Sequence, residues 1–232
     1  MKRVNGYVHR QDFIVRLCQG KRVLDLGIVG ATCENSDLRV DVFPTQLHLR
    51  IAGVCGGLVG MDYSAKEIDA IRQRFPDLTL YSGDVTELSC VMPPAKFEVV
   101  VMGNLIEHLS NPGRALDEIA TFLTPESRLI ITCPNAFGLP NFLRFTAGRF
   151  EEGADHVASY TKHTLSNLLR RHQYEVLEVW SGVDATPTST TRKALYALGS
   201  PVLRRAPEIG GTLIVVAQPR REATASLALD GA

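Results

Sequence analysis

Two glycines follow a short apolar segment near the beginning of the chain. Residues 23–30 read Val-Leu-Asp-Leu-Gly-Ile-Val-Gly. The apolar run predicts a buried strand, and Gly27 and Gly30 carry no Cβ, so a ligand can approach the backbone of the turn closely. Such a turn can hold a nucleotide-like ligand. Glycines also occur in turns that only pack a strand against a helix, so this pattern alone leaves both interpretations open.

Polar residues follow each of the next three apolar segments. Asp62 ends the second segment, Asp84 follows the third, and Asn104, Glu107 and His108 follow the fourth. The carboxyl ends of parallel strands share one edge of a sheet, and ligands bind there at the point where the strand order reverses. A carboxylate at the end of the second strand can accept hydrogen bonds from both hydroxyls of a ribose. Alternatively, Asp62 caps the next helix and Asp84 closes a turn.

The elements that must position these residues alternate along the chain. Apolar, β-branched segments alternate with segments of helical periodicity, which is typical of a parallel sheet flanked by helices. Seven strands are expected, at residues 21–26, 57–62, 78–81, 97–102, 128–133, 174–180 and 212–217. The pattern therefore predicts an α/β fold with a doubly wound sheet.

Three helices have recognisable N-terminal signals. Ser64 and Glu67 have capping-box spacing at the start of a helix over residues 64–75. Asn111, followed by a proline, is an N-cap for a helix through residue 122, and Thr161 can cap a third.

Three connections are longer than the alternation requires: residues 31–45, 135–160 and 184–207. Long loops in compact domains tend to be lids or binding segments. The second connection carries four large apolar residues beside two arginines, and the third is basic with no acidic residue after residue 184. Together they could cap an apolar or anionic small molecule. Alternatively, an amphipathic helix covers the sheet and presents a solvated basic face.

Composition excludes several classes of protein. The 232 residues contain 25 Lys and Arg against 25 Asp and Glu, so no net charge draws the chain onto nucleic acid. The five cysteines show no Cys-x-x-Cys spacing, which argues against a disulfide framework and a structural zinc. No apolar run approaches the ~18 residues of a membrane span or forms a signal peptide. We expect a cytoplasmic protein with free thiols; the sequence does not indicate its oligomeric state.

Residues 20–180 resemble class I S-adenosylmethionine-dependent methyltransferases, including small bacterial members. In that family V-L-D-x-G-x-G-x-G cradles the methionine part of the cofactor. Residues 97–109 are similar to F-D-V-V-x-x-x-x-x-I-E-H-L, and residues 155–165 to D-H-V-x-x-[FY]-[ST]-x-x-T-L. Residues 112–135 match P-x-x-x-L-x-E-x-x-x-x-L-x-P-x-x-x-L-I-I-T-x-P-N. Val29 and Ala31 stand where the family usually has glycine.

The resemblance implies a Rossmann-like methyltransferase domain over residues 20–218, with lid segments 135–160 and 184–207. Residues 1–19 would be an N-terminal helical segment, and residues 219–232 a disordered tail. It assigns cofactor binding to Asp25, Gly27, Ile28, Gly30, Asp62, Tyr63, Asp84, Val85, Asn104 and Leu105. Among these, Asp62 would hold the ribose, while Tyr63, Asp84 and Val85 would lie at the adenine.

The implied reaction is methylation of a small-molecule acceptor, such as a glycosylated, polyketide-like or lipid-linked compound. Residues 103–106 do not form the Asn-Pro-Pro-Tyr motif of amino-group methylation in DNA, which favours a hydroxyl acceptor. His156 and His108 are the candidate general bases, with His156 preferred because Asp155 adjoins it and could orient its ring.

No metal is expected, because Asn104 replaces the first carboxylate of the Glu-x-x-Glu-His arrangement that binds a divalent metal in some members. Two other functions remain open: a metal-assisted methyltransferase acting on RNA ends, and a degenerate cofactor-binding protein without activity. A dinucleotide-binding dehydrogenase is disfavoured, because Gly27 and Gly30 lack the Gly-x-Gly-x-x-Gly spacing.

Overall fold

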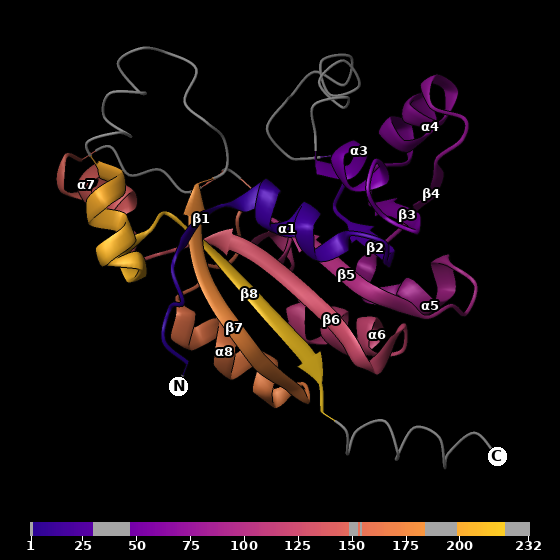
Figure 1. Ribbon diagram of the computed structural model, residues 1–232. Coiled ribbons are helices and arrows are strands. Elements are labelled where there is room, and N and C mark those ends of the chain that lie inside the picture. The colour runs from indigo at the N-terminus through magenta and orange to yellow at the C-terminus, as the bar shows by residue number, and fades with distance from the viewer. Residues whose placement is uncertain (1, 30–46, 149–152, 154, 184–198, 221–232) are drawn as a thin grey trace.

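A single mixed sheet forms the centre of the computed structural model, which describes all residues except 1, 30–46, 149–152, 154, 184–198 and 221–232 (Figure 1). Its strand order is β1-β7-β8-β6-β5-β2-β3-β4. The strands are β1 (Tyr7–His9), β2 (Arg22–Leu26), β3 (Gly57–Asp62), β4 (Thr79–Ser82), β5 (Phe97–Gly103), β6 (Leu123–Pro134), β7 (Tyr174–Val183) and β8 (Thr212–Pro219).

Most neighbouring strands are parallel, and β8 alone runs antiparallel to both of its neighbours, β6 and β7. The chain runs from β2 outward to β3 and β4 on one side, and β5 then returns to pair with β2 on the other. The strand order therefore reverses between β2 and β5. A crevice is expected at the carboxyl ends of these two strands.

Helices cover both faces of the sheet. The helices are α1 (Arg10–Cys18), α3 (Leu47–Ala52), α4 (Ala65–Arg74), α5 (Leu88–Val91), α6 (Pro112–Ala120), α7 (Leu139–Thr146) and α8 (Lys162–Arg171). Short 3-10 helices are η2 (Val85–Glu87), η3 (Ile106–His108) and η4 (Pro207–Ile209). Within the described ranges, none of the helices is long and apolar enough to cross a membrane.

The alternation of side chains along each strand builds two separate cores. Val23, Val99 and Val101 face α1 and α3 in one apolar cluster. Leu24 and Val100, one residue along, face α6 and α8 in the other. This is the period-2 geometry of a strand, and it decides which face each residue of β2 can reach.

All seven predicted strands form, and the predicted doubly wound α/β fold is confirmed. The structure adds β1, which lies in the N-terminal segment expected to be helical, ahead of α1. Three residues are too few to show an alternating pattern. Backbone hydrogen bonds hold this segment on β7, from Asn5 N to the Val179 oxygen (2.7 Å) and from Ser181 N to the Gly6 oxygen (3.0 Å).

Two of the three predicted helix caps are confirmed. The Asn111 side chain accepts a hydrogen bond from the Arg114 N–H, and Thr161 forms a reciprocal capping box with Thr164. Ser64 differs, because its side chain makes no cap hydrogen bond to the backbone. Its hydroxyl instead donates to the carboxylate of Glu67.

A buried tyrosine joins the sheet to α6. Tyr174, at the start of β7, is fully buried, and its hydroxyl donates to the Leu116 carbonyl oxygen at 2.8 Å. Burial raises the pKa of Tyr174, with a smaller contribution from the negative charge of Asp117. The raised pKa keeps the hydroxyl protonated, so it can donate this hydrogen bond.

Tyr174→Phe should lower the free energy of unfolding by about 1 kcal/mol, because it removes this hydrogen bond and leaves a buried carbonyl oxygen with one partner fewer. Urea denaturation followed by circular dichroism measures the change. Tyr63→Phe is the matched control, since that side chain is 80% exposed. An unchanged unfolding midpoint for Tyr174→Phe would contradict the expectation.

Candidate functional site

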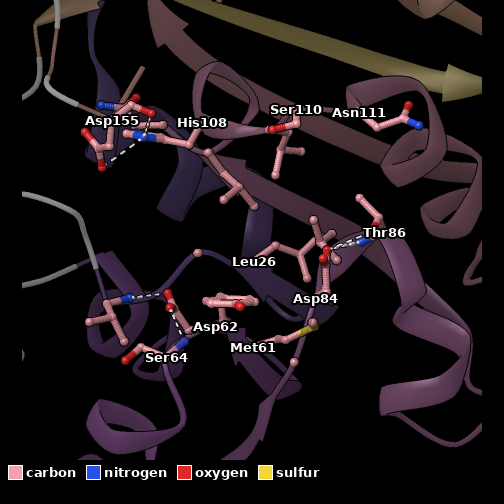
Figure 2. A pocket seen from close by; sticks show the side chains of 18 residues that line it. Leu26, Met61, Asp62, Ser64, Asp84, Thr86, His108, Ser110, Asn111 and Asp155 are labelled. Atoms are coloured by element: carbon pink, nitrogen blue, oxygen red, sulfur yellow. Dashed lines mark hydrogen bonds and ion pairs between the residues drawn. The ribbon is translucent and has the colours of Figure 1, made fainter. Parts of the chain in front are cut away.

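A cavity of about 670 Å³ lies where the strand order reverses, at the carboxyl ends of β2, β3 and β5 (Figure 2). Its size suits a ligand of drug or cofactor dimensions. The lining residues are Leu26, Gly27, Val29, Met61, Asp62, Tyr63, Ser64, Gly83, Asp84, Val85, Thr86, Asn104, Leu105, His108, Leu109, Ser110, Asn111 and Asp155.

The turn after β2 requires a glycine. Gly27 has φ +77° and donates its N–H to the Met61 oxygen at 2.9 Å. A Cβ at this position would come within 3.3 Å of the Leu105 side chain. A larger residue would therefore be strained and would also push into Leu105, so the turn depends on glycine for both conformation and space.

The Asp62 carboxylate is held by two backbone groups. Its Oδ2 accepts from the Val29 N–H at 2.9 Å, and its Oδ1 accepts from the Ser64 N–H at 3.1 Å. These bonds join the turn after β2 to the start of α4. Each oxygen keeps a second lone pair, so the fixed carboxylate can still accept hydrogen bonds from a pair of hydroxyls in the cavity. The capping and binding interpretations of Asp62 are thus compatible.

The next wall of the cavity combines apolar surface with a second carboxylate. Tyr63 is exposed beside the cavity, and Val85 is a buried residue of its wall. Asp84 caps η2, with its Oδ1 accepting from the N–H and the hydroxyl of Thr86, both at 2.8 Å. An aromatic side chain, an aliphatic wall and a carboxylate acceptor together suit a planar base with an exocyclic amino group.

Asn104 has an unusual backbone conformation at the tip of β5. Its φ is +52°, a value that asparagine adopts more readily than most residues. The Thr132 hydroxyl donates to its Oδ1 at 2.9 Å, and its own N–H reaches the Thr132 carbonyl oxygen at 3.0 Å. Arg10 Nη1 donates to the same hydroxyl at 3.2 Å. This network fixes Asn104, with Leu105 after it, on the cavity wall.

Two residues expected to bind the cofactor do not line the cavity. Asp25 is buried and pairs with Nδ1 of His48 on α3 at 2.9 Å, away from the cavity lining. Ile28 packs in an apolar cluster with residues of α4 and is likewise not in the lining. Gly30 lies outside the described residues. Asp25 and Ile28 therefore support the turn from behind.

The two candidate bases lie together, although only one lines the cavity. His108, at the end of η3, is in the lining, and Nδ1 of its ring is 3.2 Å from the Asp155 Oδ2. The ring of His156 lies edge-on to it, with 4.7 Å between the ring centroids. Asp155 was expected to orient His156, its neighbour in sequence. The structure pairs Asp155 with His108 instead.

Glu107 lies beside the two histidines, and no function was expected of it alone. The residue is only 2% exposed, and its carbonyl oxygen accepts from the N–H groups of Val157 and Ala158, at 2.9 and 3.2 Å. Together with burial, the larger cause, its charge raises the pKa values of Cys133 and Tyr160. Burial could not be foreseen, because glutamate is rarely buried.

Sequence comparison identifies a family. Residues 11–179 match the model of a family described as a methyltransferase domain. The chain is 28% identical over 127 residues to a protein of Mycolicibacterium smegmatis that carries the name of an S-adenosylmethionine-dependent methyltransferase. It is 26% identical over 212 residues to the 2-phytyl-1,4-naphtoquinone methyltransferase of Thermosynechococcus vestitus. The first match covers 54% of this chain and 46% of the relative, and the second 88% and 83%.

Solved structures share the fold. Magnesium protoporphyrin IX methyltransferase from Synechocystis, solved with bound SAH, has a TM-score of 0.58 at 14% identity, covering 90% of this chain and 82% of that one. A SAM-dependent methyltransferase from Archaeoglobus fulgidus has a TM-score of 0.55 at 16% identity, covering 90% and 91%.

The relatives differ in the share of their own length that matches this chain. The chain spans about half the length of the mycolicibacterial relative, and 30% of a similarly named protein of Mycobacterium tuberculosis at 31% identity. The family model, in contrast, covers most of the present chain, from α1 through most of β7. The chain belongs to the class I S-adenosylmethionine-dependent methyltransferase family, whose cofactor is S-adenosylmethionine.

Proposed function

We propose that this protein transfers a methyl group from S-adenosylmethionine to a hydroxyl of a small-molecule acceptor. The observation that carries the proposal is the cavity at the reversal of strand order, where the oriented carboxylate of Asp62 and the turn at Gly27 meet. When bound, the cofactor supplies a methyl group on a positively charged sulfur. The protein must then hold that methyl and the acceptor oxygen close and in line.

The residues of the cavity suit the parts of the cofactor in turn. Asp62 accepts hydrogen bonds from the two ribose hydroxyls, and Tyr63, Asp84 and Val85 surround the adenine. Gly27, Asn104 and Leu105 lie at the methionine part. Asp25 and Ile28 take no direct part and hold the turn after β2 in place.

The histidine pair is the part of the site that suits the acceptor. His108 lines the cavity beyond the cofactor residues, and the ring of His156 lies against it. A neutral imidazole accepts a hydrogen bond from a hydroxyl and can take its proton as the methyl is transferred. The Gly-Asn-Leu-Ile sequence at residues 103–106, without prolines or tyrosine, also supports an oxygen acceptor.

Apolar surface near the site supports a bulky acceptor. Helix α7, within the proposed lid segment 135–160, exposes Phe142, Leu143 and Phe145. Two similar proteins named above are a 2-phytyl-1,4-naphtoquinone methyltransferase and a magnesium protoporphyrin IX methyltransferase, whose named acceptors are bulky small molecules. The proposed second lid, residues 184–207, lies largely outside the described residues. A glycosylated, polyketide-like or lipid-linked small molecule fits better than nucleic acid, since the net charge is zero.

Asp62→Ala should raise the dissociation constant for S-adenosylmethionine at least about tenfold, because two hydrogen bonds to a charged group are lost and each contributes about 1.5 to 3 kcal/mol. Isothermal titration calorimetry measures the constant. Asp69→Ala is the matched control, since that carboxylate is an exposed partner of Arg72 on α4. An unchanged constant for Asp62→Ala would remove the assignment of the ribose to this residue.

His156→Ala should lower the maximal rate about a hundredfold with cofactor affinity unchanged, because a positioned imidazole contributes on the order of 10²- to 10⁴-fold. The rate is measured as formation of the demethylated cofactor in a screen of hydroxylated acceptors at saturating S-adenosylmethionine. His163→Ala is the control, since that residue hydrogen-bonds to Asn167 on α8. If only His108→Ala lowers the rate, the two rings exchange roles; if neither does, the acceptor ionises without help.

A further inference from the structure

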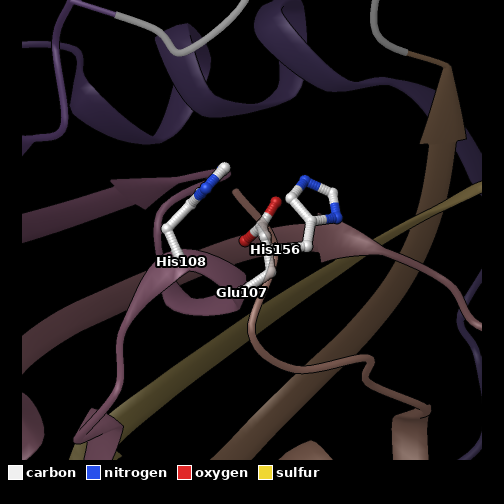
Figure 3. A group of neighbouring side chains, drawn as sticks. All are labelled: Glu107, His108 and His156. Carbon is white, nitrogen blue, oxygen red and sulfur yellow. The ribbon is translucent and has the colours of Figure 1, made fainter. Parts of the chain in front are cut away.

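Three side chains with metal-binding atoms gather beside the cofactor cavity. They are Glu107 and His108 of η3, and His156 from the segment before α8 (Figure 3). One donor atom from each residue lies within 4.8 Å of the others. We propose that these residues bind a divalent transition-metal ion, such as Zn²⁺ or Mn²⁺.

The backbone holds the ligands from both segments in place. The Glu107 carbonyl oxygen accepts from the N–H groups of Val157 and Ala158, which fastens the segment after His156 to η3. His156 N donates to the Gly153 oxygen at 2.9 Å, and a Cβ on Gly153 would come within 2.6 Å of the His156 ring. Three backbone hydrogen bonds and a glycine thus set the position of the His156 imidazole.

The donor set indicates the class of metal. Two imidazoles with one carboxylate are ligands of Zn²⁺ and other first-row transition metals, whereas Mg²⁺ and Ca²⁺ prefer several oxygen ligands. Ligands about 2.1 Å from a tetrahedral Zn²⁺ lie about 3.4 Å apart. In the structure the three donor atoms lie at most 4.8 Å from one another. Side-chain movements of about 1 Å would therefore bring them to the ligand spacing of a tetrahedral Zn²⁺ site.

A second carboxylate orients one ligand. Asp155 Oδ2 lies 3.2 Å from Nδ1 of His108, and the Asp155 carbonyl oxygen lies 3.3 Å from the same nitrogen. Both contacts favour a proton on Nδ1, which leaves the lone pair on Nε2 for a metal. Carboxylate or carbonyl partners of this kind support most metal-binding histidines. Asn104, in contrast, is turned toward Thr132, whose hydroxyl donates to its Oδ1.

The consequence for the reaction rests on the proposed function. Three protein ligands leave a fourth position for water or an acceptor oxygen, as in catalytic zinc sites. A divalent cation lowers the pKa of a hydroxyl that it binds, so the proton can leave to water. His108 and His156 would then act as ligands and not as proton acceptors.

This inference departs from the expectation of no metal. That expectation counted the carboxylates near residue 104 and found one replaced by asparagine. Nothing in the sequence alone shows that His156, 48 positions after His108, lies beside η3, as it does in the structure.

The test is direct metal binding by the full chain after removal of bound metal with a chelator and dialysis. Calorimetric titration with ZnCl₂ should show one site, and CoCl₂ should give visible absorption bands of a low-symmetry site. Glu107→Gln and His156→Gln should each weaken Zn²⁺ binding at least about a hundredfold. Asp155→Asn should weaken it about tenfold, as loss of a supporting partner does. His163→Gln should leave the constant unchanged.

Absence of Zn²⁺ binding, or equal binding by the parent protein and both ligand variants, would overturn the metal site. Thermal unfolding of each metal-free variant confirms its fold; should Glu107→Gln not fold, His156→Gln decides the question alone. S-adenosylmethionine affinity is measured on the same samples. If the parent protein binds S-adenosylmethionine but not Zn²⁺, only this inference is overturned. If the parent protein binds Zn²⁺ but not S-adenosylmethionine, the proposed function is overturned.

Discussion

The reversal of strand order between β2 and β5 is the constraint on which the site depends. The chain leaves these neighbouring strands in opposite directions, so the backbone after them separates and opens a crevice at the sheet edge. Gly27 keeps the first turn tight through its positive φ, and Asp62 ties that turn to α4 through the N–H groups of Val29 and Ser64. The same hydrogen bonds also fix the orientation of the Asp62 carboxylate in the wall of the cavity.

The sequence predicted best where the signal is local. All seven expected strands form, and the caps at Asn111 and Thr161 are confirmed, because alternation and capping act within a few residues. Asp25 shows the limit of a linear motif. Successive side chains of a strand point to opposite faces, so with Leu26 in the cavity lining Asp25 turns toward α3 and His48. The residues of a sequence motif are neighbours along the strand, but their side chains alternate between its two faces, so only some of them reach the cavity.

The histidine pair shows why long-range contacts were missed. Sequence proximity suggested that Asp155 orients His156, whereas Asp155 pairs with His108 from a segment 47 positions earlier. In irregular backbone, the side chains of neighbouring residues commonly point in different directions. The partner of each side chain then depends on which other segment of the chain packs against it. Here the segment that contains His156 is held against η3 by hydrogen bonds from the N–H groups of Val157 and Ala158 to the Glu107 carbonyl oxygen. These backbone hydrogen bonds have no signature in the sequence. Strand β1 was missed for a different reason, since its three residues are too few to show an alternating pattern.

The buried carboxylate of Glu107 bears on how the two imidazoles can act. A charged carboxylate in apolar surroundings is costly unless positive charge or hydrogen-bond donors lie close to it. Burial, together with the negative charge of Glu107, raises the pKa values of Cys133 and Tyr160, so neither group adds a second negative charge beside it. A cation bound by the two imidazoles would place positive charge beside this carboxylate. With three protein ligands, such a cation also keeps a coordination position for the acceptor oxygen. The burial of Glu107 between the two imidazoles therefore suits the proposed cation.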